Sequence, residues 1–252
     1  MDVPSSHEPP RLSVVIPALN EARNIGHVLG TLPDEVFEVI LVDGHSTDGT
    51  VEVARAIRGD IRVVVQPGTG KGDALAAGFA ACRGDVVVML DADGSADGAE
   101  IPRFVDALMA GSDLVKGSRF LNGGGSTDLT PLRRAGNRVF CSMVNGLFGT
   151  RYSDLCYGYN AAWLQELHGL SLDCGGFEVE TVLSIRSARS GLRVTEVPSL
   201  EASRLYGRSN LRTFRDGWRV LRAIFREWRA SPAEAPVPGS APVEPVRDPV
   251  RP

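Results

Sequence analysis

Two aspartates separated by a single residue follow an apolar run. Asp91 and Asp93 come directly after residues 86–90 (VVVML), a run typical of a strand buried on both faces. Ligands of open α/β sheets bind at the carboxyl ends of the strands, where this pair would lie. Two hard carboxylate ligands there suit Mg²⁺ or Mn²⁺ holding a diphosphate. An Asp-x-Asp pair alone is weakly specific, so a solvated acidic turn is the alternative.

Polar side chains also follow two earlier apolar runs. Residues 17–21 (PALNE) end the first run, and Asp43 ends the second. We expect these ends side by side at one edge of the sheet, holding the base and ribose of a nucleotide. Asp43 would accept hydrogen bonds from the nucleoside. Asn20 could instead simply cap the following helix.

A glycine-rich loop containing a lysine lies at residues 68–73 (GTGKGD). Its three glycines permit close backbone approach, and Lys71 supplies a compact positive charge for a phosphate. Only Lys71 and Lys116 are lysines among the 27 basic residues, so a lysine here stands out against an arginine background. A flexible turn before a helix is the alternative, because the GxxxxGK[ST] pattern is missing.

Strands and helices alternate through the first half of the chain and would position these residues. The strand-like runs are 12–17, 36–42, 61–65, 86–90 and 113–116. The helical stretches are about 21–31, 49–58, 72–82 and 97–110. This alternation predicts an α/β fold with a mostly parallel central sheet and helices on both faces.

The alternation stops after residue 117. A glycine-rich loop at 120–130, a candidate lid, is followed by three helices and one strand. The helices are expected at about 131–148, 177–190 and 211–229, and the strand at 192–197. We expect a single domain over 11–230, with a nucleotide-binding half at about 11–117 and an acceptor half at about 118–230. Residues 1–10 are predicted to be a flexible arm and 231–252 a disordered Pro-rich tail.

Bulk composition is that of an ordinary globular protein, with 43% hydrophobic and 23% charged residues. The net charge of −4 gives no support to nucleic-acid binding. The four cysteines form no CxxC pair, and the chain has no signal-peptide core and no apolar run of about 18 residues. These features predict a cytoplasmic protein with reduced thiols.

The segments LSVVIPALNE, LVDGHSTDGT, GTGKGDAL and VVMLDADGS resemble, in order and approximate spacing, those of family 2 glycosyltransferases. These are inverting enzymes with the GT-A nucleotide-diphosphosugar transferase fold. Later segments, KGSRF, RRAGN, SDLCYGYNAAW, GFEVETVL and RLYGRSNLRTF, are most similar to dolichyl- and polyprenyl-phosphate sugar synthases. The resemblance covers about residues 11–229. The chain lacks the Q-x-x-R-W motif of processive polysaccharide synthases and the G-x-G-T-R loop of sugar-nucleotide pyrophosphorylases.

The resemblance implies a role for each matching position. The residues implied to bind the donor are Pro17, Ala18, Asn20, Glu21, Asp43, Lys71, Gly72 and Asp91. Asp91 and Asp93 are implied to bind the metal and the donor diphosphate. The residues implied to face the acceptor phosphate, or to close over the phosphates, are Arg119, Arg133, Asn137, Arg204, Ser209 and Asn210. The sequence departs from the family pattern at Ser95, where Gln is common, and at Asn210, where Lys is common.

These roles predict a metal-dependent transfer of a hexose from GDP- or UDP-hexose to a polyprenyl phosphate, with Mg²⁺ or Mn²⁺ as cofactor. Such an acceptor needs no general base, because the second pKa of a phosphate monoester is about 6. The alternative is a soluble glycosyltransferase that acts on a hydroxyl or amine of a small-molecule or carrier-bound acceptor. A hydroxyl acceptor would need a carboxylate base, for which Asp154 and Glu180 are candidates. Either carboxylate could equally be structural.

The last predicted helix, at 211–229, carries an apolar stripe beside an arginine stripe. The apolar stripe comprises Leu211, Phe214, Trp218, Leu221, Phe225 and Trp228. The arginines follow one position later, at 212, 215, 219, 222, 226 and 229. This pattern suits an anionic membrane surface and would place the protein at the inner face of the plasma membrane. The alternative is a core-packing stripe with a solvated basic edge.

Overall fold

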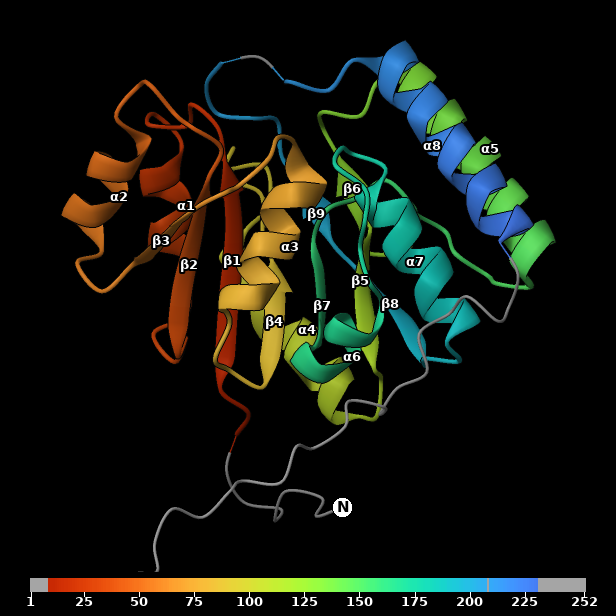
Figure 1. Cartoon of the computed structure of the whole chain (residues 1–252), viewed down its shortest axis with the longest axis horizontal. Coiled ribbons are helices and arrows are strands. Elements are labelled where there is room, and N and C mark those ends of the chain that lie inside the picture. The colour runs from red at the N-terminus through yellow and green to blue at the C-terminus, as the bar shows by residue number, and fades with distance from the viewer. Residues whose placement is uncertain (1–8, 208, 231–252) are drawn as a thin grey trace, which may run out of the picture.

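A seven-stranded sheet forms the centre of the protein (Figure 1). The computed structural model describes residues 9–207 and 209–230. The strand order is β3-β2-β1-β4-β7-β5-β8, and only β7 runs antiparallel to its neighbours. The strands are β1 (Leu12–Ala18), β2 (Glu38–Asp43), β3 (Arg62–Val65), β4 (Val86–Met89), β5 (Leu114–Ser118), β7 (Asn160–Trp163) and β8 (Val194–Pro198). The predicted α/β fold with a mostly parallel sheet is confirmed.

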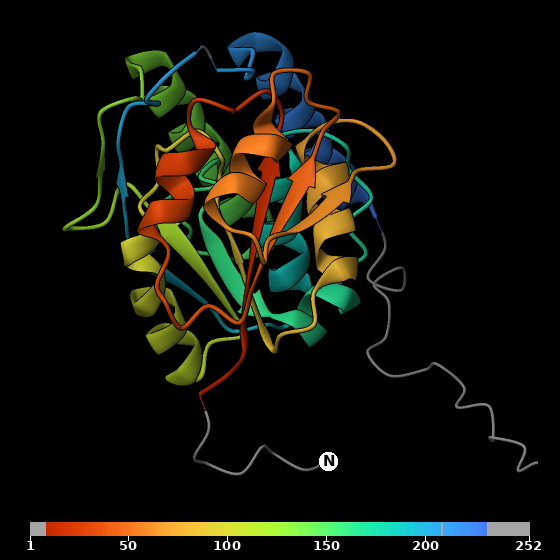
Figure 2. The same ribbon diagram turned by 90° about the vertical axis from the view of Figure 1, so that its left-hand side faces the viewer.

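Helices cover both faces of this sheet. One layer comprises α1 (Ile25–Thr31), α2 (Thr50–Ile57) and α4 (Ile101–Met109), the last preceded by the short 3-10 helix η1 (Gly98–Glu100). The other comprises α3 (Lys71–Ala81), α6 (Leu164–Gly169) and α7 (Val179–Arg189). Figure 2 shows α3 and α4 on opposite sides of the sheet. Strands β2 and β4 are buried along their whole length, because apolar side chains on both pleats pack against these two layers.

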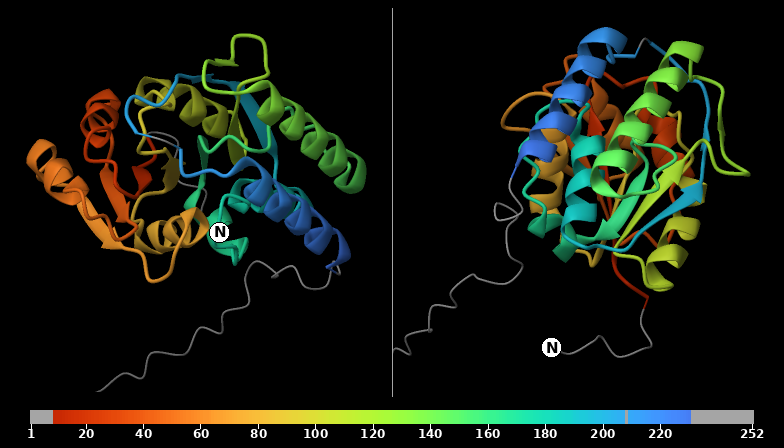
Figure 3. Two further views of the ribbon diagram at one scale, coloured as in Figure 1. Left: turned by 90° about the horizontal axis from the view of Figure 1, so that it is seen from above. Right: turned by 90° about the vertical axis from the view of Figure 1, so that its right-hand side faces the viewer.

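Two long helices, α5 (Pro131–Phe148) and α8 (Thr213–Arg229), lie beside α7 (Figure 3). A separate apolar cluster joins the three helices. It includes Val144 of α5, Ile185 of α7 and Ile224 of α8, each with no exposed surface. None of the helices within residues 9–207 and 209–230 has both the length and the apolar character needed to cross a bilayer.

The glycine-rich loop at 120–130 is held by a second, two-stranded sheet. Its strands are β6 (Gly125–Ser126) and β9 (Leu200–Glu201). The Glu201 carboxylate also accepts a hydrogen bond from the Ser126 hydroxyl. The loop predicted as a lid is therefore tied at its middle to the segment that follows β8.

The structure contains four elements that the sequence analysis does not predict: β7, α6, and the two-residue strands β6 and β9. Strand β7 escapes prediction because its pairing with β4 and β5 is made across the sheet and has no local signature. Helix α1 begins at Ile25 instead of residue 21, after a turn closed by the Glu21 carbonyl, and α8 begins at Thr213. Apart from residues 9 and 10, the predicted arm lies outside the described residues, as does the whole predicted tail at 231–252.

Candidate active site

The Asp91–Asp93 pair lies just beyond the carboxyl end of β4, at the edge predicted from the sequence. The Asp91 carboxylate pairs with the ammonium of Lys71, with 2.5 Å between Oδ1 and Nζ. Asp93 Oδ1 accepts the backbone N–H of Ser95 at 3.0 Å, and its Oδ2 lies 3.4 Å from Arg204 Nη2. Both carboxylates remain partly exposed, 35% for Asp91 and 23% for Asp93, and are thus accessible to a ligand.

Lys71 lies at the start of α3, between two carboxylates. Its ammonium is 2.5 Å from Asp91 Oδ1 and 2.8 Å from Glu180 Oε1. Burial by itself would lower the pKa of Lys71, but the two carboxylates outweigh it and hold the pKa above its ordinary value. Burial also raises the pKa of Glu180, although Lys71 opposes that shift. Gly158 faces this group so closely that a Cβ there would overlap both Lys71 Nζ and Asp91 Oδ2.

One cavity, of about 270 Å³, brings most of the predicted donor residues together. We call it the donor-side cavity. The predicted residues that line it are Pro17, Ala18, Glu21, Lys71, Asp91, Asp93, Arg204, Ser209 and Asn210. Gln66 and Phe177, which the sequence analysis did not single out, line it too. Phe177 belongs to the GFEVETVL segment that carried the family resemblance, and this was the only signal for it.

Three predicted donor residues lie beside this cavity but do not line it. The buried Asp43 carboxylate accepts the N–H of Ser46, with both oxygens at 3.2 Å. Asn20 adopts a left-handed backbone with φ of 57° and accepts the N–H of Thr47 at 2.8 Å. A Cβ on Gly72 would overlap the Cys174 carbonyl. In this structure Asp43 and Asn20 hold the loop that follows β2, and Gly72 allows the start of α3 to pack closely on Cys174. The roles of these three residues in donor binding stay predictions.

A second cavity, of about 410 Å³, extends from the same aspartates toward α5 and α8. We call it the acceptor-side cavity. Its polar lining includes Lys71, Asp91, Asp93, Arg119, Arg133, Asn137, Glu180 and Ser209. Its apolar lining includes Leu132 and Phe140 of α5, Leu211, and Phe214, Trp218 and Leu221 of α8. Because both cavities are lined by Lys71, Asp91 and Asp93, they meet at the aspartate pair.

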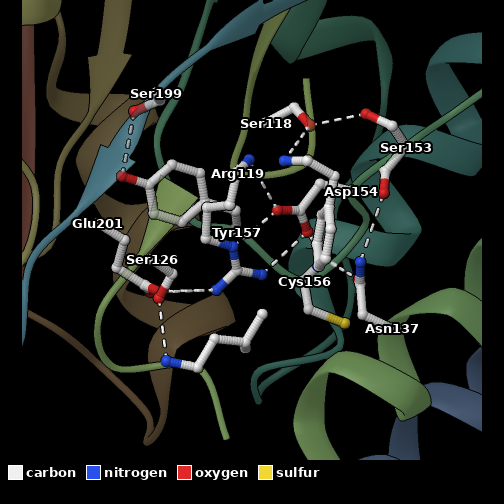
Figure 4. Close-up of polar contacts among 12 residues, drawn as sticks. Ser118, Arg119, Ser126, Asn137, Ser153, Asp154, Cys156, Tyr157, Ser199 and Glu201 are labelled. Atoms are coloured by element: carbon white, nitrogen blue, oxygen red, sulfur yellow. Dashed lines mark hydrogen bonds and ion pairs between the residues drawn. The ribbon is translucent and has the colours of Figure 1, made fainter. Parts of the chain in front are cut away.

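Arg119 is held within the protein by two carboxylates (Figure 4). Its Nε and Nη2 donate to the Asp154 carboxylate at 2.7 and 2.9 Å, and its Nη1 donates to Glu201 at 3.1 Å. Burial opposes the charge, but these carboxylates keep the pKa of Arg119 above its ordinary value. Asp154 has no exposed surface, and it does not line the acceptor-side cavity.

Asn137 and Arg133, also predicted to face the acceptor phosphate, differ in how firmly they are held. Asn137 is buried, and its side-chain oxygen accepts the N–H groups of Leu155 and Cys156 at 3.1 and 3.2 Å. Arg133 is partly exposed and lies 3.6 Å from Asp128, too far for a hydrogen bond. The guanidinium of Arg133 is therefore more available to a ligand than that of Arg119.

The segment around Arg204 crosses above the donor-side cavity and is anchored on the first half of the chain. Arg204 donates to Glu21 Oε1 at 2.7 Å. Burial opposes the charge, but Glu21 and Asp93 outweigh it and hold the pKa of Arg204 above its ordinary value. The Tyr206 carbonyl accepts from Asn24 at 3.1 Å, while Arg23 stacks over the Tyr206 ring at 4.1 Å. These contacts bring two segments about 180 residues apart into one wall of the site.

The aspartate pair fits a divalent cation that shares its coordination with a ligand. Asp91 and Asp93 offer hard carboxylate oxygens, and Mg²⁺-type sites commonly use one or two carboxylates plus substrate phosphates and water. Across residues 9–207 and 209–230, no cluster of three or more His, Cys, Asp or Glu side chains could hold a metal by itself. A cation at this pair would complete its coordination with oxygens of a bound diphosphate or of water.

The fold and the two joined cavities define a GT-A glycosyltransferase. A family model described as glycosyl transferase family 2 matches residues 13–182, more than half of the chain. The chain belongs to this family, and the predicted GT-A fold and glycosyltransferase activity are confirmed.

Two relatives share most of their length with this chain. Dolichyl-phosphate hexose transferase of Haloferax volcanii is 33% identical over 219 residues, covering 85% of this chain and 92% of that protein. Polyprenol monophosphomannose synthase of Mycolicibacterium smegmatis is 32% identical over 233 residues, covering 86% of each. The similarity therefore spans both halves of the chain.

A solved structure is also similar. It is glucosyl-3-phosphoglycerate synthase from Mycobacterium tuberculosis in complex with Mn²⁺, UDP-glucose and phosphoglyceric acid. The TM-score is 0.68 at 28% sequence identity, covering 87% of this chain and 80% of that one. That protein binds a divalent cation, a nucleoside-diphosphate sugar and a phosphorylated acid.

Proposed function

We propose that this protein transfers a hexose from a nucleoside-diphosphate sugar to a polyprenyl phosphate, in a reaction that inverts the anomeric centre and requires Mg²⁺ or Mn²⁺. The half at about 11–117 would bind the donor, and the half at about 118–230 the acceptor. Relatives named for dolichyl-phosphate and polyprenol substrates support the acceptor class. The solved relative with Mn²⁺ and UDP-glucose supports the donor class and the cation.

The observation that carries this proposal is the mixed lining of the acceptor-side cavity. The lining combines charged side chains, Asp91, Asp93, Lys71 and Arg133, with apolar side chains of α5 and α8. A phosphate head group suits Lys71 and Arg133, since guanidinium and ammonium groups bind phosphate through charge-assisted hydrogen bonds. An isoprenoid chain suits the apolar side chains, because its burial is favourable in proportion to area.

In the proposed reaction an acceptor phosphate oxygen attacks the anomeric carbon, and the bond from that carbon to the diphosphate oxygen breaks on the opposite face. Arg133 would orient the attacking phosphate, while Lys71 and Arg204 would place positive charge beside the donor diphosphate. A divalent cation held by Asp91 and Asp93 would neutralise charge that develops on the leaving diphosphate.

The two carboxylates considered as bases are both occupied in the structure. Asp154 is fully buried against Arg119, and Glu180 is 4% exposed and paired with Lys71. A hydroxyl acceptor would require one of them to be free to take a proton. A phosphate acceptor needs no base because it is largely dianionic at pH 7. The ion pairs therefore favour the phosphate.

The outer surface of α8 supports a membrane location. Phe214, Trp218 and Trp228 are 82%, 60% and 52% exposed, whereas the helix packs on the core through Val220 and Ile224. The six arginines of the predicted arginine stripe are exposed as well. Exposed aromatics beside arginines suit the interface of an anionic bilayer. We therefore propose peripheral binding at the inner, cytoplasmic face of the plasma membrane.

A second candidate is transfer to a soluble acceptor. It is favoured by the solved relative, whose bound phosphoglyceric acid has no lipid chain. A small acceptor would contact mainly the charged side chains of the acceptor-side cavity. It would leave the apolar surfaces of α5 and α8 without a role in binding.

The test is to incubate the full chain with Mn²⁺, radiolabelled UDP-hexoses or GDP-hexoses, and polyprenyl phosphate in mixed vesicles. We expect label to enter the organic phase as an acid-labile product with one of these donors. A parallel incubation replaces the lipid with phosphoglyceric acid or with unphosphorylated sugars. Label that enters only the water-soluble products would overturn the lipid-phosphate proposal in favour of the second candidate.

A further inference from the structure

The Lys71 ammonium lies between the carboxylates of Glu180 and Asp91 and pairs with both. This position gives Glu180 a role other than that of a base. We propose that Glu180 is a positioning residue that shares the Lys71 ammonium with Asp91 and thereby leaves Asp91 able to bind a divalent cation. This inference rests on the metal site of the proposed function.

Three separate elements build this arrangement. Lys71 opens α3, Asp91 follows β4, and Glu180 lies in the first turn of α7. The Lys71 side chain is 10% exposed and the Glu180 side chain 4%, so solvent can replace neither partner. Gly158 closes the remaining side, since any Cβ there would overlap the ammonium. The ammonium is therefore confined between the two carboxylates.

The charges determine what Glu180 contributes. A lysine paired with Asp91 alone would neutralise that carboxylate and repel a cation at the aspartate pair. Glu180 supplies a second negative charge on the far side of the ammonium, so the trio carries a net charge of −1. Because Lys71 and Glu180 are largely buried, their charges are screened less by water than charges on the surface are. Glu180 thus lowers the effective competition between Lys71 and the cation for Asp91.

The same arrangement has an opposite effect on anions. Neutralising Glu180 would make the surroundings of Lys71 more positive, which favours a diphosphate and disfavours a cation. Damage to the fold would weaken the binding of both. The two ligands, measured separately, therefore distinguish charge sharing from a merely structural role.

The test compares wild type with Glu180→Gln, which keeps the shape and removes the charge. Mn²⁺ is titrated by calorimetry, and pyrophosphate is titrated separately in EDTA. We expect Mn²⁺ to bind Glu180→Gln roughly threefold to tenfold more weakly, with pyrophosphate bound equally or more tightly. Glu180→Asp, which retains the charge, should recover most of the Mn²⁺ affinity. The control is Glu178→Gln on the same segment, whose carboxylate accepts from the Gly176 N–H instead.

A second variant keeps the inference testable if Glu180→Gln does not fold. Lys71→Met removes the competing ammonium and should bind Mn²⁺ at least as tightly as wild type, but pyrophosphate more weakly. Equal Mn²⁺ affinity in wild type and Glu180→Gln would overturn this inference alone. Loss of turnover in Glu180→Gln with unchanged Mn²⁺ binding would do the same, because the contribution of Glu180 would then not pass through the cation. Absence of Mn²⁺ binding to wild type, with and without UDP or GDP, would overturn the proposed metal site as well.

Discussion

Arg119 and Asp154 form a two-pronged ion pair inside the protein, with Nε–Oδ2 and Nη2–Oδ1 distances of 2.7 and 2.9 Å. Glu201 accepts from the remaining terminal nitrogen, Nη1, and also holds Ser126 of the 120–130 loop. The guanidinium thus connects β5, the loop before β7 and the small β6–β9 sheet. We expect Arg119 to hold together the segments that form the wall of the acceptor-side cavity. Its three guanidinium nitrogens already donate to Asp154 and Glu201, so we do not expect Arg119 to bind the acceptor phosphate.

Arg119→Ala is expected to destabilise the fold by about 3–5 kcal/mol, because it leaves the buried Asp154 carboxylate without its partner. Urea unfolding at pH 7 measures this loss. Arg133→Ala is the matched comparison, since Arg133 is partly exposed and its ion-pair partner Asp128 is 3.6 Å away and 41% exposed. It should change stability by no more than about 0.5 kcal/mol and impair use of the acceptor. A stable Arg119→Ala protein with only a raised KM for the acceptor would instead indicate direct phosphate binding.

The strand-end residues could be predicted from the sequence because the pattern of apolar runs is local. The carboxyl ends of parallel strands meet at one edge of the sheet, which predicts that Asp91, Asp93 and residues 17–21 lie together. Of these, Asp91, Asp93, Pro17, Ala18 and Glu21 line the donor-side cavity, whereas Asn20 lies beside it. The partners of Arg119 could not be predicted, because Asp154 and Glu201 lie 35 and 82 residues further along the chain. An ion pair between remote segments leaves no periodic signal.

The orientation of α8 could not be predicted from the sequence either. Both stripes were evident from the sequence, but periodicity does not say which face of a helix meets the core. In the structure a third set of residues, Val220, Ala223 and Ile224, packs inward, and the aromatic stripe is largely exposed. Core packing is therefore not the role of that stripe, and membrane binding stays a prediction to be tested.

Glu38 is expected to make stability depend on acidic pH at the end of the sheet remote from the site. Burial would raise its pKa, but hydrogen bonds from Arg83, Ser13 and Arg62 outweigh burial and lower the pKa to about 2 from an ordinary 4.5. Between about pH 2 and pH 4.5 the folded state therefore binds fewer protons than the unfolded state. The stabilisation, up to about 3 kcal/mol, is complete above pH 4.5 and is lost as pH falls toward 2.

Glu38→Gln isolates this contribution from that of other carboxylates. Urea unfolding of wild type and variant should differ most at pH 7, and the difference should shrink below pH 4.5 and vanish only as pH falls to about 2. Donor binding should be unaffected at pH 7, because Glu38 lies at the opposite end of β2 from Asp43. A difference in stability that stays constant from pH 7 to pH 2.5 would show that the carboxylate charge contributes nothing.

Gly158→Ala is expected to disrupt the site without a large effect on the core. The new Cβ would overlap Lys71 Nζ and lie 2.8 Å from Asp91 Oδ2, which forces the pair apart. We predict at least about a tenfold loss of donor affinity, measured by titration with UDP and GDP sugars in the presence of Mn²⁺. Gly146→Ala in α5 is the control, because its Cβ meets nothing within 4 Å and helix propensity favours it by about 1 kcal/mol. Normal donor affinity in Gly158→Ala would mean that the Lys71–Asp91 pair does not need this geometry.

Asp93→Ala is expected to reduce sugar transfer by at least about a hundredfold, since charge on the leaving diphosphate would lose its stabilising cation. Transfer by wild type should likewise stop in EDTA and return with Mn²⁺ or Mg²⁺. Asp97→Ala is the control four residues later, because Asp97 caps η1 and lines neither cavity. Thermal unfolding should show that both variants are folded. Undiminished transfer by Asp93→Ala would remove this carboxylate from the reaction.

The exposed face of α8 is expected to bind anionic vesicles. Arg215→Glu combined with Arg222→Glu should weaken co-sedimentation with phosphatidylglycerol vesicles by a factor of ten or more, since each basic residue near such a surface contributes about 1 kcal/mol. Trp218→Ser should weaken it through loss of an apolar contact. High salt should release wild type, because the Debye length shrinks to about 3 Å at 1 M.

The control for this membrane prediction is Arg55→Glu on α2, an exposed arginine on a different helix. It should sediment like wild type, and all variants should bind the donor normally, because none of the substituted arginines lines the donor-side cavity. The transfer assay then tests whether binding of α8 to the vesicle is needed for sugar transfer to polyprenyl phosphate. Variants that leave the vesicles should lose transfer to polyprenyl phosphate in bilayers but retain it in detergent, where the acceptor no longer has to be reached at a membrane. If wild type does not bind anionic vesicles and glycosylates a water-soluble acceptor, then α8 has no membrane role and the second candidate function is correct.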